Sequence, residues 1–455
     1  MPIILVGVPA VRPANPSPAP SSPPAAPANA REQHSNWHVQ NTDIVQSDPS
    51  FPALYSGPNS LNSNGEVQET VSLDLFGGAR LGRALEAHMD ALMWQGFGLS
   101  KTFGIESFPN GDAYKAGTMV PNFVFARLFL RQTIGLGGAQ EDVPDDQLTL
   151  AGKEDVSRIT LTLGRFTPKD MFDNNAYAND PHTQFMNWAF LSNSTWDYAA
   201  DSVGYTTGLA AELNQAKWTL RYGFFQMPGV PNSFSVEDQF LKWPNGGTDG
   251  PFFTTWGMAG EFERRYNVNT HPGTVRLLSW LNEANMSSYQ AATAILLANG
   301  PGADISATRA YRYKYGFGLS WDQEVLTNVG VFSRVGWNDG QTTPWNYTDT
   351  NHSASVGVSV KGGWWHRPDD TFALAGCVSG ISSANEQFLK AGGTGILDGD
   401  GALNYGYEKN LETYYDFKIW KSLHGAVDYQ YVVNPAFNRD RGPVSIFGAR
   451  LHWEL

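Results

Sequence analysis

The chain ends on the stretch Val444-Ser445-Ile446-Phe447-Gly448-Ala449-Arg450-Leu451-His452-Trp453-Glu454-Leu455, in which two kinds of side chain alternate. From Phe447 on, the odd positions are apolar, and the even positions are glycine or carry polar groups. Because successive side chains of a β-strand point to opposite faces, this strand has one apolar and one charged face. Such a terminal strand is typical of a membrane β-barrel with a lipid-facing surface and an aqueous lumen. A half-buried strand of a soluble β domain would show the same alternation. Whether the pattern recurs along the chain distinguishes the two interpretations.

The alternation recurs along most of the chain. It is clearest from Tyr311 to Asp322, where every odd position is apolar or aromatic and every even position is charged, polar or glycine. Five aromatic side chains on one face of one strand exceed what a shared core usually takes, and they suit a lipid-facing strand with interfacial aromatics.

Roughly sixteen such segments predict an antiparallel barrel with both termini on one side. They lie near 37–48, 69–81, 83–95, 122–134, 156–167, 201–214, 217–228, 255–268, 273–285, 307–324, 329–340, 353–365, 371–382, 411–421, 423–434 and 444–455. Connections at 81–82 and 421–422 are minimal, whereas 96–121, 135–155 and 383–410 are long. Short periplasmic turns and long extracellular loops are therefore expected. Residues 180–198 predict a loop with a short helix, folded into the lumen or lying on the surface.

Composition narrows the class of protein. None of the 455 residues belongs to a stretch that approaches the ~20 apolar residues of a membrane helix, so a helical membrane protein is excluded. The net charge of −13 argues against nucleic acid as a partner and favours cations or neutral solutes. The single cysteine, Cys377, excludes an internal disulfide framework and reads as a packing residue.

The first 30 residues differ from the rest. A short apolar start precedes a tract rich in Pro, Ala and Ser that cannot bury enough surface to fold, and Ala28-Asn29-Ala30 has the form of a signal-peptidase site. The basic region of a signal peptide is missing, so a plain disordered tail fits as well. We expect residues 1–30 to be this signal-like segment and 31–455 to be a single barrel domain.

Several stretches resemble one family. They are Glu412–Phe417, Asp428–Pro435, Phe447–Leu451, Leu163–Phe166 with the following Met171-Phe172, and Phe125–Gln132. Over most of 120–455 the chain resembles the OprB-type carbohydrate-selective porins of Gram-negative outer membranes. The resemblance implies a sixteen-stranded barrel, passive diffusion of monosaccharides such as glucose, and an eyelet of arginines, acids and aromatics. The sequence departs from the family at Trp37-His38-Val39-Gln40, in place of a Trp-Gly-Gly-type opening, and at Leu455, where an aromatic is usual.

A sugar channel has to replace part of the hydration of a neutral, hydroxyl-rich solute. Arginine offers a fixed fork of donors, and aromatic faces stack on a pyranose. On the strand 122–134, parity directs Val124, Ala126, Leu128 and Leu130 to lipid. It directs the other set inward, namely Phe123, Phe125, Arg127, Phe129 and Arg131. Arg127, Arg131, Phe125 and Phe129 are therefore the first candidates for the constriction, with packing against an infolded loop as the alternative.

Further lumen candidates follow from parity. Glu86, His88 and Asp90, with Asp74 and Arg80 on the neighbouring strand, are expected to balance the arginines across the pore or to form a general polar lining. Arg312, Lys314 and Asp416 also face inward. Trp280 is either a stacking platform or an interfacial tryptophan in a strand of opposite parity.

The sequence predicts no reaction, cofactor or metal site. Nothing resembles a nucleotide loop or a supported His pair, and Asp398-Gly399-Asp400-Gly401 lacks the spacing of an EF-hand, so it reads as a turn. The expected partners are carbohydrates and outer-membrane lipid, and the protein is a monomer or a homotrimer. Two alternatives stay open, a general or other-solute channel and a soluble all-β carbohydrate-binding protein or glycosidase.

Overall fold

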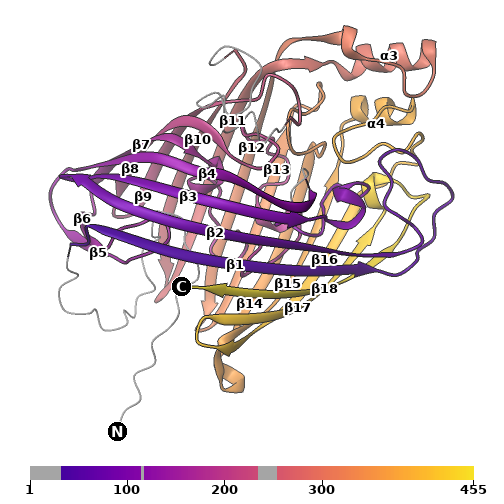
Figure 1. Ribbon diagram of the computed structural model, residues 1–455. Coiled ribbons are helices and arrows are strands. Elements are labelled where there is room, and N and C mark those ends of the chain that lie inside the picture. The colour runs from indigo at the N-terminus through magenta and orange to yellow at the C-terminus, as the bar shows by residue number, and fades with distance from the viewer. Residues whose placement is uncertain (1–31, 114–116, 234–253) are drawn as a thin grey trace.

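The computed structural model describes residues 32–113, 117–233 and 254–455. Within these residues, sixteen strands close into one antiparallel barrel in the order β1-β18-β17-β16-β15-β14-β13-β12-β11-β10-β9-β8-β7-β4-β3-β2 (Figure 1). Their bounds are β1 Ser35–Asp48, β2 Glu66–Gly82, β3 Leu85–Gly96, β4 Thr118–Gly135, β7 Arg158–Phe166, β8 Thr206–Gln215, β9 Trp218–Gln226, β10 Trp256–Val268, β11 His271–Ser287, β12 Arg309–Leu326, β13 Val329–Asn338, β14 His352–Gly362, β15 Arg367–Gly380, β16 Glu408–Trp420, β17 Leu423–Val433 and β18 Val444–Glu454.

The barrel closes between its first and last strands. β1 pairs with β2 on one side and with β18 on the other, in a register that runs from Gln40 opposite Glu454 to Ser47 opposite Phe447. Closure matters because a bilayer offers no hydrogen-bond partner to the free edge of a sheet. Each of the predicted segments overlaps one barrel strand, so the predicted fold class is confirmed.

The two faces of the barrel have opposite character. On β12 the outward side chains Tyr311, Tyr313 and Phe317 are 54%, 56% and 55% exposed, whereas the inward Lys314 and Asp322 are buried. A soluble sandwich shares an apolar core and exposes its polar faces. The arrangement here is the reverse, so the soluble all-β alternative is wrong.

The connections differ between the two rims. Two-residue turns at 83–84, 216–217, 269–270, 327–328 and 421–422 join strands at one rim. Asn269 and Asn328 adopt left-handed backbone conformations there, with φ of 57° and 73°, as tight hairpins require. The opposite rim carries the long loops, including 167–205 and 381–407. The expected asymmetry of the rims is confirmed.

One long connection, 136–157, lies on the short-turn rim instead of with the other long loops. It forms a separate hairpin of β5 Gln140–Val143 and β6 Gly152–Asp155, which the sequence reading missed. The tip of this hairpin crosses to β1, where Asn36 donates to Asp145 at 2.8 Å and Gln147 donates to Gln40 at 2.8 Å.

Short helices occur in the long loops. In the part of the chain that the structure describes, the α-helices are α1 Trp188–Leu191, α3 Tyr289–Asn299 and α4 Ser383–Lys390, and the 3-10 turns are η1 Leu99–Thr102, η2 Pro168–Asp170, η3 Ser306–Thr308, η4 Gly363–Trp365 and η5 Pro435–Phe437. α3 and α4 pack against each other at the long-loop rim through the rings of Tyr289 and Phe388 (Figure 1). No helix among the described residues is long and apolar enough to cross a membrane.

The loop 167–205 folds into the barrel, which agrees with the first of the two alternatives predicted for residues 180–198, a loop in the lumen rather than on the surface. Phe185, Phe190 and Trp196 in this loop are buried against inward side chains of the wall, among them Phe225 and Phe332. The lumen is therefore lined on one side by this loop rather than by strands. The signal-like segment expected at 1–30 lies outside the described residues.

We predict that Leu319→Arg destabilises the barrel by about 2–4 kcal/mol, because Leu319 lies near the middle of the outward face of β12 and is 40% exposed. Unfolding of the purified protein by urea in lipid vesicles measures the effect. Leu319→Met keeps the apolar contact with lipid and should leave the free energy of unfolding nearly unchanged. Equal stability of the two variants would contradict a lipid-facing β12.

Candidate solute pathway

The arginines and acids predicted to line the lumen face one another on adjacent strands. In the register of β3 and β4, Glu86 lies opposite Arg131, His88 opposite Phe129, and Asp90 opposite Arg127. The expectation that these acids balance the arginines from across the pore is therefore wrong. Cross-strand neighbours lie only about 5 Å apart, so each pair forms a local contact within one patch of wall.

Phe125 does not belong to this patch. The register of β4 shifts so that Asp90 faces Arg127 while Ala91 faces Phe125, which leaves Ala126 as an extra residue in a β-bulge. Both Ala126 and Arg127 consequently point inward, and the strand residues that precede the bulge in the chain have the opposite parity from the one predicted. Phe123 and Phe125 are 67% and 40% exposed on the outer face, so their predicted place in the lumen is wrong.

Arg127 joins the wall to the infolded loop. Its Nη1 donates to Asp90 Oδ2 at 2.6 Å, and its Nε and Nη2 donate to the two oxygens of Asp170 at 2.9 and 2.8 Å. The guanidinium also lies over the ring of Tyr205, at 5.2 Å from the centroid. Asp90 is fully buried, whereas the side chains of Arg127 and Asp170 remain 15% and 13% exposed. Arg127 therefore bridges the lumen with part of its surface still in contact with solvent.

A second group continues from Arg127 toward the short-turn rim. The ring of His88 stacks on Phe129 at 5.2 Å, and the guanidinium of Arg131 lies 5.1 Å from the same phenyl ring. Arg131 Nη1 donates to the carbonyl of Leu148 at 2.7 Å, so it holds the tip of the β5–β6 hairpin. Glu86 contacts both Arg80 and His88 at 3.1 Å.

The remaining predicted residues all face inward, but loops cover most of them. Asp74 accepts a hydrogen bond from Gln40 at 2.8 Å, and Lys314 donates to the carbonyl of Thr342 at 3.1 Å. Arg312 is half-buried near the long-loop rim. Trp280 is 4% exposed within an aromatic cluster, so it has no open face for stacking.

Asp416 positions a loop anchor. It accepts from His424 at 2.7 Å and from Arg450 at 3.2 Å, and Arg450 donates to the carbonyls of Pro181 and Gln184. The carboxylate therefore orients an arginine that binds the loop backbone.

Wall carboxylates hold the backbone of the infolded loop. Glu412 on β16 accepts from the amides of Met186 and Asn187 at 2.6 and 3.0 Å. Glu261 on β10 accepts from the amide of Asp173 at 2.7 Å. Charge-assisted hydrogen bonds of this kind are the stronger ones, and they replace the strand partners that a loop inside a barrel lacks.

Sequence reasoning missed the loop half of the site. Lys169 and Asp170 lie outside the predicted and the observed barrel strands, so strand parity could not assign them a direction. Tyr205 falls within the predicted segment 201–214 but lies just before β8 in the structure. Arg165 on β7 faces inward and pairs with Asp201 at 2.7 Å, whereas the sequence places it only within the family-like stretch Leu163–Phe166. A cluster of charged residues in 165–173 is the one signal that was available.

Burial and pairing set the charges of the loop. Burial lowers the pKa of the Lys169 ammonium to about 8, against the opposing attraction of Asp173. Burial alone would also lower the pKa of His182, but the carboxylates of Asp180 and Asp112, at 2.8 and 3.0 Å, raise it well above its usual value. The loop thus presents a cationic imidazole and a lysine that titrates near neutral pH.

Aromatic side chains fill the lumen on the long-loop side. Phe108, Trp188, Tyr347 and Tyr198 form a continuous stack with centroid distances of 5.0, 5.7 and 4.2 Å. They come from the connections 97–117, 167–205 and 339–351. Each ring is nearly buried, so the stack ties three loops together.

Comparison with known proteins identifies related chains. A family model described as carbohydrate-selective porin, OprB family, matches residues 58–455. The high-pH structure of OprB from Pseudomonas putida is similar over 93% of this chain and 94% of that chain, with a TM-score of 0.69 and 15% sequence identity. Its low-pH structure covers 93% of each chain with a TM-score of 0.49 and 12% identity. OccK2 of Pseudomonas aeruginosa gives 0.47 and 9%, over 93% of this chain and 99% of that one. No curated protein sequence gives a significant match.

We predict that Glu412→Ala loosens the infolded loop and widens the pore. The change removes the acceptor of two buried amides, and each unsatisfied amide costs about 1–3 kcal/mol. Single-channel recording in planar bilayers should show higher and noisier conductance than the wild type. Glu386→Ala on α4, whose carboxylate is partly exposed, is the matched control. Unchanged conductance in Glu412→Ala would show that these contacts do not hold the loop.

Proposed function

Because the chain belongs to the OprB family of carbohydrate-selective porins, whose model matches residues 58–455, we propose that sugars cross the barrel beside Arg127. The protein is a sugar-selective porin of the Gram-negative outer membrane. We assign the constriction, with the groups that select the solute, to the space between the β2–β4 wall and the infolded loop 167–205.

The contacts of Arg127 carry the proposal. Its guanidinium spans from Asp90 on the wall to Asp170 on the loop, and it remains partly exposed beside Tyr205. A sugar hydroxyl can donate to these carboxylates and accept from the arginine, which compensates the water that the sugar loses at the constriction. Weak and exchangeable contacts of this kind let a solute enter and leave.

The balance of charge supports selection of neutral solutes. Around Tyr205, two guanidiniums are paired with three carboxylates, which leaves neither a basic field for anions nor an open ring of acids for cations; the groups are Arg127, Arg165, Asp90, Asp170 and Asp201. Lys169 and His182 on the loop add positive charge close to Asp173, Asp180 and Asp112. An acid-selective channel would need a more basic lining, so this arrangement favours carbohydrates over other solutes.

We also propose that transport is diffusion without a chemical step and that residues 31–455 act as one barrel domain. The groups assigned to the constriction all come from one chain. A single barrel is then a complete channel, whether the protein is a monomer or a homotrimer.

Arg127→Ala should slow the entry of glucose into liposomes containing the purified protein, while Arg309→Ala, at the exposed rim of β12, should not. The first variant removes the donor fork at the constriction. We expect a several-fold loss of the swelling rate and a smaller ratio of glucose to gluconate entry. Arg131→Ala should also lower the rate, because the hairpin tip at Leu148 loses its anchor. Equal rates for all solutes in the wild type would contradict selection at this site.

The charge preference of the channel should depend on pH through Lys169. Its folded-state pKa of about 8 means that the ammonium is charged below this pH and neutral above it. Raising the pH from about 7 to 9 therefore removes a positive charge and should shift the reversal potential in a KCl gradient toward cation selectivity. Lys169→Met should lack this step, and its persistence in the variant would assign the step to another group.

A further inference from the structure

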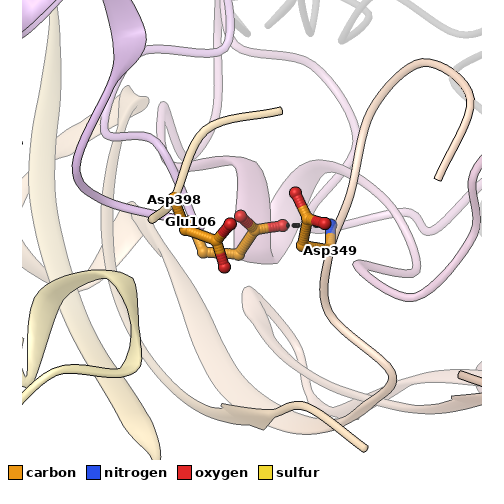
Figure 2. Close-up of side chains that lie close together, drawn as sticks. All are labelled: Glu106, Asp349 and Asp398. Carbon is orange, nitrogen blue, oxygen red and sulfur yellow. Dashed lines mark hydrogen bonds between the residues drawn. The ribbon is translucent and has the colours of Figure 1, made fainter. Parts of the chain in front are cut away.

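Three acidic side chains from three separate loops meet at the long-loop rim. Glu106 lies in the connection 97–117, Asp349 in 339–351 and Asp398 in 381–407. Figure 2 shows their carboxyl groups side by side, with Glu106 between the other two. One oxygen from each lies within 4.8 Å of the others.

The cluster is buried and short of hydrogen-bond donors. Glu106, Asp349 and Asp398 are 1%, 1% and 0% exposed. Both oxygens of Asp398, and Oε2 of Glu106, have no hydrogen-bond partner among the described residues. A fully buried carboxylate without a donor is expensive, and native proteins normally provide such a group with a proton, a donor or a cation.

The other oxygens of the cluster accept hydrogen bonds from backbone amides and hydroxyl groups. Glu106 Oε1 accepts from the amides of Asp349 and Thr350 and from the hydroxyl of Thr348. Asp349 accepts from the Tyr289 hydroxyl at 3.2 Å and from the Ile396 amide at 2.8 Å. These bonds orient the carboxylates of Glu106 and Asp349. They leave Glu106 Oε2 and both oxygens of Asp398 without a hydrogen-bond donor.

No basic side chain among the described residues forms an ion pair with Glu106, Asp349 or Asp398; the ion pairs of the neighbouring acid, Asp400, involve Arg441 instead. Burial raises the pKa of both Glu106 and Asp398 well above the usual range, and repulsion from the neighbouring carboxylates raises it further. Without a cation, protonation of the carboxylates would relieve this repulsion, which the charge of Lys314 offsets in part at Asp349.

We propose that Glu106, Asp349 and Asp398 bind a divalent cation of the calcium type, which links the three loops at the extracellular mouth of the barrel. All the ligand atoms are carboxylate oxygens, which suit hard cations rather than the softer metals that histidine and cysteine bind. Two oxygens on one Ca²⁺ lie up to about 5 Å apart, since each Ca–O distance is about 2.3–2.6 Å. The spacing within 4.8 Å fits this limit.

Space around the cluster is reserved by a glycine. A Cβ on Gly395 would lie 2.0 Å from Asp398 Oδ1 and 2.5 Å from Asp349 Oδ2. Any larger residue at this position would separate the two carboxylates. The side chain of Asn59 donates to the carbonyls of Gly395 and Asp398, so a fourth loop fixes the backbone of this segment.

Terbium luminescence with the folded, EGTA-treated full chain tests the proposal. Tb³⁺ replaces Ca²⁺ at oxygen sites, and Tyr289, bonded to Asp349, lies close enough to sensitise its emission. We expect a saturable signal that Ca²⁺ displaces. Asp398→Asn and Glu106→Gln should each weaken Tb³⁺ binding by more than about tenfold, whereas Asp304→Asn, on the exposed loop before β12, should not.

Heat-modifiable migration in gels verifies that each variant keeps its barrel. A second measurement needs no variant: Ca²⁺ should slow proteolysis of the loops 97–117, 339–351 and 381–407 in the wild type and should release protons on binding. Absence of a saturable Tb³⁺ signal, equal signals in Asp398→Asn and the wild type, or no protection by Ca²⁺ would each overturn the proposal. None of these readouts depends on sugar transport, so they separate the cation site from the proposed pathway.

Discussion

The structure depends on carboxylates that accept hydrogen bonds from the backbone of loops inside the barrel. A strand in the wall finds its partners in the next strand, but a loop in the lumen has none, and a buried amide without an acceptor is costly. Glu412 serves two amides of the infolded loop, and Glu408 serves those of Glu106 and Ser107. Asp197 does the same for three consecutive amides that begin at Trp345. Much of the net charge of −13 therefore has a structural use within the lumen.

This use of acids explains why the lumen is asymmetric. The anchors of the loop 167–205 lie on β10, β13, β16 and β18, through Glu261, Arg334, Glu412 and Arg450. The facing wall of β3 and β4 contacts the loop through the ion pair of Arg127 with Asp170, and through Leu92, Trp94 and Ala126, which pack against Val203 and Tyr205. Most of the polar anchors of the loop backbone therefore lie on one side of the barrel. The group that remains on the other side is an arginine with partial exposure, which is the position where a passing solute can compete for its donors.

Strand periodicity predicted the barrel, because each residue's direction in a regular strand follows from its number alone. The same rule failed at Ala126, since a bulge adds one residue and reverses the parity of the strand residues that precede it in the chain. No glycine or proline marks the position in the sequence. Parity could not assign a direction to Asp170, which lies outside the predicted strands, and Tyr205 precedes the observed strand; the contacts of both side chains are with Arg127, more than thirty residues away. The sequence thus predicted the wall half of the candidate site, except for Phe125, and not the loop half.

At Asp398, a buried carboxylate has no backbone amide left to accept from. Read locally, Asp398-Gly399-Asp400-Gly401 is a turn, and its carboxylate would be solvated at a surface. In the fold, the turn closes onto Glu106 and Asp349, whose own oxygens already take the nearby amides. The carboxylate oxygens at this junction outnumber the backbone donors, and the oxygens left without a donor are buried. A cation satisfies several carboxylates at once, which amide donors at this junction cannot do. A chain that uses acids to hold its loops therefore gains a cation site where those loops converge.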